Sequence, residues 1–264
     1  MGILEVGIFI LSILMVVFLM YKKEVRKQYV ISLLTLTILF ITFHLIFGEI
    51  RWQLNTLYIA VIMLMIIVNF KSTFNNYFKN FVRRIIITVL SVLVVISMIS
   101  AFVFPVFDMP KPNGEYLIGT ESFVIEDNLR IEQYSGNAND FRKTKIQIWY
   151  PAESITGYEL APWLEDGKVV SSALAKDMGL PSFVLNHTVD VMSNSYVEAP
   201  ISNALNNYPV VIISHGWRGF RNLHTDFAEE LASQGYIVVG IYHSYGSVAT
   251  VYSDDDIALL NLEA

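Results

Sequence analysis

The stretch Tyr208-Pro-Val-Val-Ile-Ile-Ser-His-Gly-Trp-Arg-Gly219 decides how the second half of this 264-residue chain is interpreted. Residues 210–213 are a continuous β-branched and apolar run, which is typical of a strand buried on both faces. The strand ends in His215-Gly216-Trp217, where a glycine lets the backbone turn tightly. We therefore predict a buried strand with a sharp turn at its carboxyl end.

A helix and a second strand are expected after this turn. Residues 223–233 have the apolar spacing of an amphipathic helix, and residues 236–242 form another apolar run. Gly235 follows the helix, where a left-handed cap residue is favoured. This order predicts a parallel βαβ unit buried on both faces. Upstream, the apolar pattern predicts strands at 122–126 and 145–150 and a helix at 168–178.

The first 107 residues have the composition of a membrane segment. They hold nine of the 18 Lys and Arg residues but only three of the 24 Asp and Glu residues. A bilayer span needs about 20 apolar residues. Four stretches reach or approach this length: 2–21, 28–48, 52–70 and 85–107. We predict a four-helix transmembrane anchor over 1–107, a linker at 108–115 and a soluble part at 116–264.

The charges between the spans predict their orientation, because positively charged loops stay in the cytoplasm. The basic residues of the first and third loops are Lys22, Lys23, Arg26, Lys27, Lys71, Lys79, Arg83 and Arg84. The second loop has only Arg51 against Glu49. We expect a multi-pass cell-membrane protein, in contact with the lipid bilayer, whose soluble part is extracytoplasmic. His44 is expected to be a neutral, hydrogen-bonded residue, and the spans to act as an anchor.

Composition excludes several classes of partner and chemistry. The soluble part is acidic, so nucleic acid is not expected, since phosphate binding needs clustered Lys and Arg. The chain has no cysteine, which excludes disulfides and a cysteine nucleophile. Asp254, Asp255 and Asp256 are more typical of a solvated turn than of a calcium site. No metal or cofactor is expected, and the oligomeric state is left open.

Five segments carry a wider pattern, in order along the chain: Ile146-Gln-Ile-Trp-Tyr-Pro151, Leu180-Pro-Ser-Phe183, residues 196–202, Ser214-His-Gly-Trp-Arg-Gly-Phe-Arg221 and Leu231-Ala-Ser-Gln-Gly-Tyr-Ile-Val238. They resemble the platelet-activating factor acetylhydrolase family, of the plasma and intracellular type II kind, in the α/β-hydrolase superfamily. The resemblance covers about residues 115–250, the first half of that family's catalytic domain. With the spans, it implies four transmembrane helices followed by an incomplete α/β-hydrolase domain, a mostly parallel β-sheet flanked by helices.

The resemblance also implies a calcium-independent serine esterase. Its substrates would be phospholipids with short or oxidised acyl chains, or other esters. In this superfamily one oxyanion donor comes from the loop after the strand that ends in His-Gly, so the backbone N–H of Trp217 is assigned that role. Gly216 would allow the turn and border the substrate, and Arg218 would narrow the mouth or lie near a substrate phosphate. His215 is expected to brace the turn.

The catalytic triad is expected to be absent from this chain. A nucleophile turn needs Gly-X-Ser-X-Gly, which the sequence lacks. The nearest match centres on Ser244, but Tyr242 stands where the first glycine is needed, and no histidine follows His243. We therefore expect a fragment of a longer reading frame that is inactive alone, with a second polypeptide as another possible source of the triad. The alternative is a non-catalytic membrane scaffold or sensor with a degenerate hydrolase module.

Overall fold

The chain divides into two compact units, Met1–Pro105 and Val106–Ala264. The structure is a computed structural model that describes residues 2–20, 27–48, 50–70 and 80–263. Several charged residues on which the predicted orientation depends lie outside the described residues: Lys22, Lys23, Arg26, Glu49, Lys71 and Lys79.

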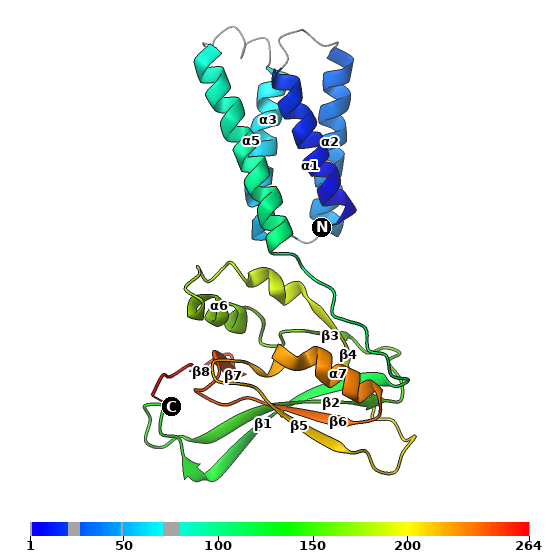
Figure 1. The fold of residues 1–264 in the computed structure, drawn as a ribbon, viewed down its shortest axis with the longest axis vertical. Coiled ribbons are helices and arrows are strands. Elements are labelled where there is room, and N and C mark those ends of the chain that lie inside the picture. Colours follow the sequence, from blue (N-terminus) through cyan, green and yellow to red (C-terminus); the bar gives the residue numbers. More distant parts are fainter. Residues whose placement is uncertain (1, 21–26, 49, 71–79, 264) are drawn as a thin grey trace. The chain divides into compact units, whose positions relative to one another are not determined.

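The first unit is a bundle of long apolar helices (Figure 1). Its elements are α1 (Ile3–Met20), α2 (Lys27–Phe47), the short 3-10 helix η1 (Trp52–Leu54), α3 (Asn55–Asn69) and α5 (Asn80–Val103). Within the described residues, four helical stretches are long and apolar enough to cross a membrane: Ile3–Met20, Gln28–Phe47, Trp52–Asn69 and Asn80–Val103. The last begins before the predicted residue 85, because Arg83 and Arg84 are good helix formers that hydropathy alone excludes.

The second unit contains a six-stranded sheet with the strand order β3-β4-β1-β2-β6-β5. The strands are β1 (Leu117–Ile131), β2 (Phe141–Ala152), β3 (Leu160–Pro162), β4 (Met192–Val197), β5 (Val210–Ser214) and β6 (Ile237–Ile241). The helices are α6 (Gly167–Asp177), η2 (Asn186–Asp190), η3 (Arg221–His224) and α7 (Thr225–Ser233). A separate hairpin follows, made of β7 (Ala249–Ser253) and β8 (Asp256–Leu259).

The prediction of a mostly parallel sheet is wrong, because the sheet is mixed. In this sheet the pairs β1·β4 and β5·β6 are parallel, while β1·β2, β2·β6 and β3·β4 are antiparallel. The physical reason is the connection between β1 and β2: a short connection of residues 132–140 can only return the chain antiparallel. The predicted strands at 122–126 and 145–150 are the middles of this long hairpin.

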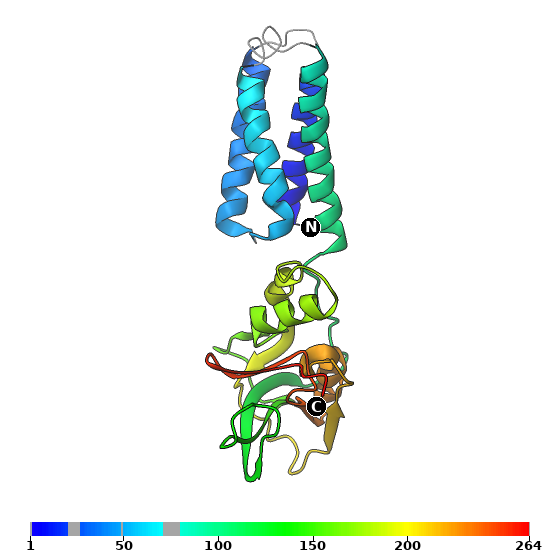
Figure 2. The same ribbon diagram turned by 90° about the vertical axis from the view of Figure 1, so that its left-hand side faces the viewer.

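The predicted βαβ unit is confirmed. Strands β5 and β6 pair in parallel, with Val210 opposite Ile237, and α7 connects them across the sheet (Figure 1). Gly235 has φ +93, the left-handed cap expected after α7. The prediction that both strands are buried on both faces is wrong for β5, because Val210 and Ile212 are 60% and 65% exposed. Strand β5 is the sheet edge, and α7 lies to one side of the strands (Figure 2).

Candidate functional site

The candidate site lies where β5 and β6 end. Parallel neighbours end at the same edge of a sheet, and in open α/β sheets ligands bind outside the carboxyl ends of the strands. The turn at 215–219 follows β5 and the turn at 242–248 follows β6. Because β2 is antiparallel to β6, with Ile146 opposite Ile241, the tip of the β1–β2 hairpin reaches this edge too.

Backbone hydrogen bonds fix the two turns to each other. The N–H of Arg218 donates to the carbonyl of Gly246 over 2.9 Å, and the N–H of Val248 donates to the carbonyl of Gly219 over 3.1 Å. Arg218 (φ +65) and Tyr245 (φ +64) are left-handed, a conformation that side-chain-bearing residues adopt only when their surroundings hold them. The turn after β5 is therefore held in one conformation.

His215 braces this turn, as predicted. Its Nδ1 donates to the carbonyl of Gly216 over 2.8 Å, so its Nε2 is an acceptor. That Nε2 lies 3.0 Å from the Ser247 hydroxyl and 3.3 Å from the backbone N of His243. Burial lowers the pKa of His215 below its ordinary value of 6.5, partly offset by the bond to Gly216. The ring is therefore neutral at pH 7 and bridges both turns.

Trp217 presents a free backbone donor. Among the described residues no acceptor is paired with its N–H, whereas the N–H groups of Arg218 and Gly219 on the same turn are both bonded. The indole is held against Gly246, where a Cβ would lie 3.3 Å from its Cζ3 atom, and the residue is 54% exposed. The turn thus combines an N–H that has no acceptor among the described residues with an exposed aromatic side chain.

A cavity of about 370 Å³ opens beside Trp217. The two turns and the tip of the β1–β2 hairpin supply its walls: Glu132, Tyr134, Arg142, Trp217, His243, Ser244 and Gly246. Aromatic, acidic and basic side chains therefore surround the exposed face of the turn.

Of the predicted site residues, the structure keeps Gly216 and Trp217 at this turn and directs Arg218 elsewhere. No atom would meet a Cβ at Gly216 within 4 Å, so the space above it is open. The Arg218 guanidinium pairs with Asp177 at the end of α6, with Nε 2.9 Å from Oδ1. The substrate-binding roles of Gly216 and Arg218 stay predictions.

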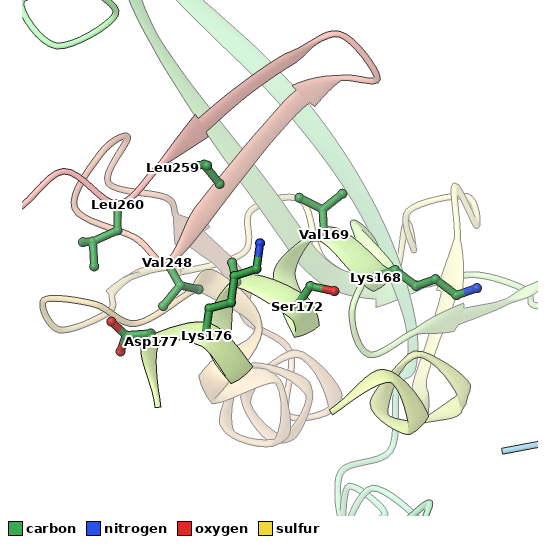
Figure 3. A pocket seen from close by; sticks show the side chains of 9 residues that line it. Lys168, Val169, Ser172, Lys176, Asp177, Val248, Leu259 and Leu260 are labelled. Atoms are coloured by element: carbon green, nitrogen blue, oxygen red, sulfur yellow. The ribbon is translucent and has the colours of Figure 1, made fainter. Parts of the chain in front are cut away.

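Asp177 belongs to a second cavity, of about 540 Å³, between α6 and the β7–β8 hairpin. Figure 3 shows Lys168, Ser172 and Lys176 along α6, with Val248, Leu259 and Leu260 across the cavity. Its walls are mainly apolar, with lysine side chains on α6.

Ser244, the centre of the nearest match to a nucleophile turn, is engaged in structural contacts. Its hydroxyl donates to the carbonyl of Lys143 over 2.6 Å and accepts from the Tyr252 hydroxyl. Burial raises the pKa of Tyr252 to about 12, so this donor stays protonated. The acidic turn begins β8, and Asp256 pairs with Lys143 over 2.6 Å. Within the described residues, no three His, Asp or Glu side chains gather as a metal site.

Two features of the site were not predicted from the sequence. The Ser214 hydroxyl lies 2.7 Å from Nε2 of His243, a contact between the ends of the two parallel strands. The far end of the turn is fixed by the fully buried side chain of Arg221. Its Nε donates to Oε1 of Gln147 over 3.0 Å, and its guanidinium carbon lies 4.7 Å from the centre of the Tyr242 ring. Neither contact can be predicted from the sequence without knowing which strands pair.

The sequence matches the family described as platelet-activating factor acetylhydrolase, isoform II, over residues 102–261. A platelet-activating factor acetylhydrolase of Cavia porcellus is 26% identical over 151 residues, which are 56% of this chain and 31% of that protein. One of Canis lupus familiaris is 28% identical over 153 residues, 54% of this chain and 30% of that protein. The chain spans about a third of the length of these relatives.

A solved structure, the ferulic acid esterase from Streptomyces cinnamoneus, has a similar fold. Its TM-score is 0.50 at 22% identity, and the match covers 60% of this chain and 42% of that chain. At this identity the likeness concerns the fold alone.

Proposed function

Because the chain belongs to the platelet-activating factor acetylhydrolase isoform II family, we propose that it forms part of a membrane-anchored carboxylic-ester hydrolase. The observation that carries this proposal is the free N–H of Trp217, on a rigid turn at the carboxyl ends of β5 and β6. Family membership supports the hydrolase class, and the geometry supports the role of this one group.

The proposed role of Trp217 follows from the charge that develops in acyl transfer. Attack on an ester carbonyl places a negative charge on its oxygen, and a preorganised N–H stabilises that charge without reorganising. The donor must point at the oxygen and have no internal partner. The N–H of Trp217 has no acceptor among the described residues, and its turn is tied at Arg218 and Gly219.

For the substrate we propose phospholipids with short or oxidised acyl chains, or other esters of similar size. The curated relatives are named for the hydrolysis of an acetyl ester of platelet-activating factor. In this chain, the cavity beside Trp217 has aromatic, acidic and basic walls, which suit an ester with polar groups near the reacting bond.

The helical unit is proposed as a membrane anchor with the hydrolase unit on the outer side. Its helices are apolar on the outside as well as the inside: Ile62 and Ile99 are 58% and 54% exposed, while Leu64 and Leu90 are fully buried. Helices that are apolar all round suit a lipid environment. The orientation rests on the basic loops of the sequence alone.

Ester turnover by the protein expressed from its complete reading frame, in isolated membranes, tests the proposal. The substrate is a 2-acetyl glycerophospholipid. Trp217→Pro removes the N–H and is expected to lower turnover about 100- to 1000-fold. Trp217→Phe keeps the N–H, loses only the indole, and is the matched control.

Two results would contradict the proposal in different ways. Equal turnover by both variants would remove the N–H of Trp217 from the mechanism. No turnover of any acyl ester by the unmutated protein would favour the alternative, a membrane scaffold or sensor with a degenerate hydrolase module.

A further inference from the structure

Ser214 and His243 have the geometry of a nucleophile and its base. The hydroxyl of Ser214 lies 2.7 Å from Nε2 of His243, within the distance over which a base takes a hydroxyl proton. Both residues are exposed, so a substrate can reach the pair. They end neighbouring parallel strands, since Ser214 pairs with Ile241 and His243 follows two residues later.

The backbone of His243 is held firmly. Its N–H reaches Nε2 of His215 over 3.3 Å, and its carbonyl accepts from the N–H groups of Gly246 (2.9 Å) and Ser247 (2.8 Å). The imidazole also lies against the ring of His215, with 4.8 Å between the centroids. These contacts hold the His243 backbone and place its ring against that of His215, and no hydrogen bond to its Nδ1 is found among the described residues.

We propose that Ser214 and His243 form a nucleophile–base pair through which this chain is acylated by activated esters. The pair is separate from the Gly-X-Ser-X-Gly serine of the superfamily, which the sequence does not contain. Its base, His243, lines the cavity beside Trp217, and Ser214 contacts that base through its hydroxyl. The inference rests on the proposed function only for the oxyanion donor.

The reaction proceeds by ordinary acyl transfer. The Ser214 oxygen bonds to the carbonyl carbon while its proton passes to Nε2 of His243. The carbonyl oxygen becomes an oxyanion, for which the N–H of Trp217 is the candidate donor. The bond to the alcohol then breaks, and His243 returns the proton to the departing alcohol. Water releases the acyl group from Ser214 by the same steps, with His243 as the base.

Acylation of the purified 264-residue chain in detergent micelles tests this pair. The reagents are p-nitrophenyl acetate and a fluorophosphonate, with the modified residue located by mass spectrometry. We expect one adduct, on Ser214, that Ser214→Ala abolishes. His243→Gln should slow its formation at least 100-fold. The controls are Ser253→Ala and His224→Gln, two exposed residues outside the cavity, which should leave the rate unchanged.

A second measurement uses the absence of cysteine from the sequence. Ser214→Cys introduces a single thiol beside His243, and Ser253→Cys introduces one at an exposed site. A neighbouring imidazole raises the thiolate fraction, so the first variant should react with iodoacetamide at least 10-fold faster at pH 7. His243→Gln in that background should abolish the difference.

The proposal would be overturned if the intact chain formed no adduct, or if the adduct still formed in Ser214→Ala. Equal rates of alkylation of the Ser214→Cys and Ser253→Cys variants would also overturn it. Neither measurement involves phospholipid turnover. A failed phospholipid assay with a Ser214 adduct would therefore reject the proposed function alone. Turnover without that adduct would reject the pair alone.

Discussion

Replacing Glu5 by glutamine should open the helical unit, because Glu5 neutralises a buried arginine. Three charge-assisted hydrogen bonds join Arg51 to Glu5: Nε to Oε1 (3.0 Å), Nη2 to Oε1 (2.8 Å) and Nη2 to Oε2 (2.7 Å). The two side chains are only 4% and 6% exposed. His44 approaches the same carboxylate (Nε2 to Oε1, 3.7 Å) and bonds the Tyr58 hydroxyl over 3.0 Å.

The magnitude follows from burial. Removing one partner of a buried ion pair leaves an uncompensated charge and costs about 3–5 kcal/mol. Since about 1.4 kcal/mol is a factor of ten in an equilibrium constant, Glu5→Gln should raise the open fraction of the unit roughly 100- to 4000-fold. The double variant Glu5→Gln/Arg51→Gln removes both charges, so it should cost less than the two single changes added together.

A single buried thiol reports this opening. The chain has no cysteine, and Ala60 of α3 is fully buried. The rate at which a maleimide labels the Ala60→Cys variant in micelles measures the open fraction when opening and closing are fast. The reasoning fails if Glu5→Gln leaves this rate unchanged. It fails equally if the double variant shows the full product of the two single effects.

Three further predictions concern the second unit. Hydrogen bonds from Asn113 lower the pKa of the Glu230 carboxyl, so the contribution of this carboxylate to folding stability is lost as the pH falls below its ordinary pKa of 4.5. The amide resonance of Asn113 should shift in that pH range in the unmutated protein and stay constant in Glu230→Gln. Burial lowers the pKa of His215, so the unfolded chain binds a proton at this residue more readily than the folded chain. The free energy of unfolding measured in urea should therefore fall as the pH drops below 6.5, and His215→Asn should make this fall with pH less steep. Glu229→Ala leaves the Ser195 hydroxyl and an adjacent backbone N–H without their buried acceptor, which should lower the free energy of unfolding by about 3 kcal/mol in urea titration.

Local sequence patterns predicted those parts of the fold that depend on neighbouring residues. The β-branched run at 210–213, the amphipathic spacing of α7 and the glycine at 235 each act within a few residues, and the βαβ unit follows from them. The mixed sheet does not follow, since it depends on which strands pair. Strand β4 was missed because its six residues include two serines and an asparagine, a polar composition without a strand signal.

The candidate site was predictable to a similar degree. Trp217 could be chosen because a strand followed by His-Gly is a local signal. The Ser214–His243 contact joins residues 29 positions apart, and it exists only because Ser214 is in register with Ile241. Glu5 and Arg51 are 46 positions apart and lie near span ends, where charged residues are expected to face water. Burial of that pair is a property of helix packing, which hydropathy does not contain.

The turn after β5 combines a fixed backbone with one donor left free. The N–H groups of Arg218 and Gly219 are bonded within the protein, and His215 bridges to the following turn through its Nε2. The N–H of Trp217 is left without an acceptor in the part of the chain that the structure describes. In its proposed role this N–H would donate to an oxyanion while the bonds of Arg218 and Gly219 keep the turn in place. In the proposed mechanism this stabilisation is specific to the transition state because the negative charge on the substrate oxygen develops only there, and a turn that is already in place adds no cost of rearrangement.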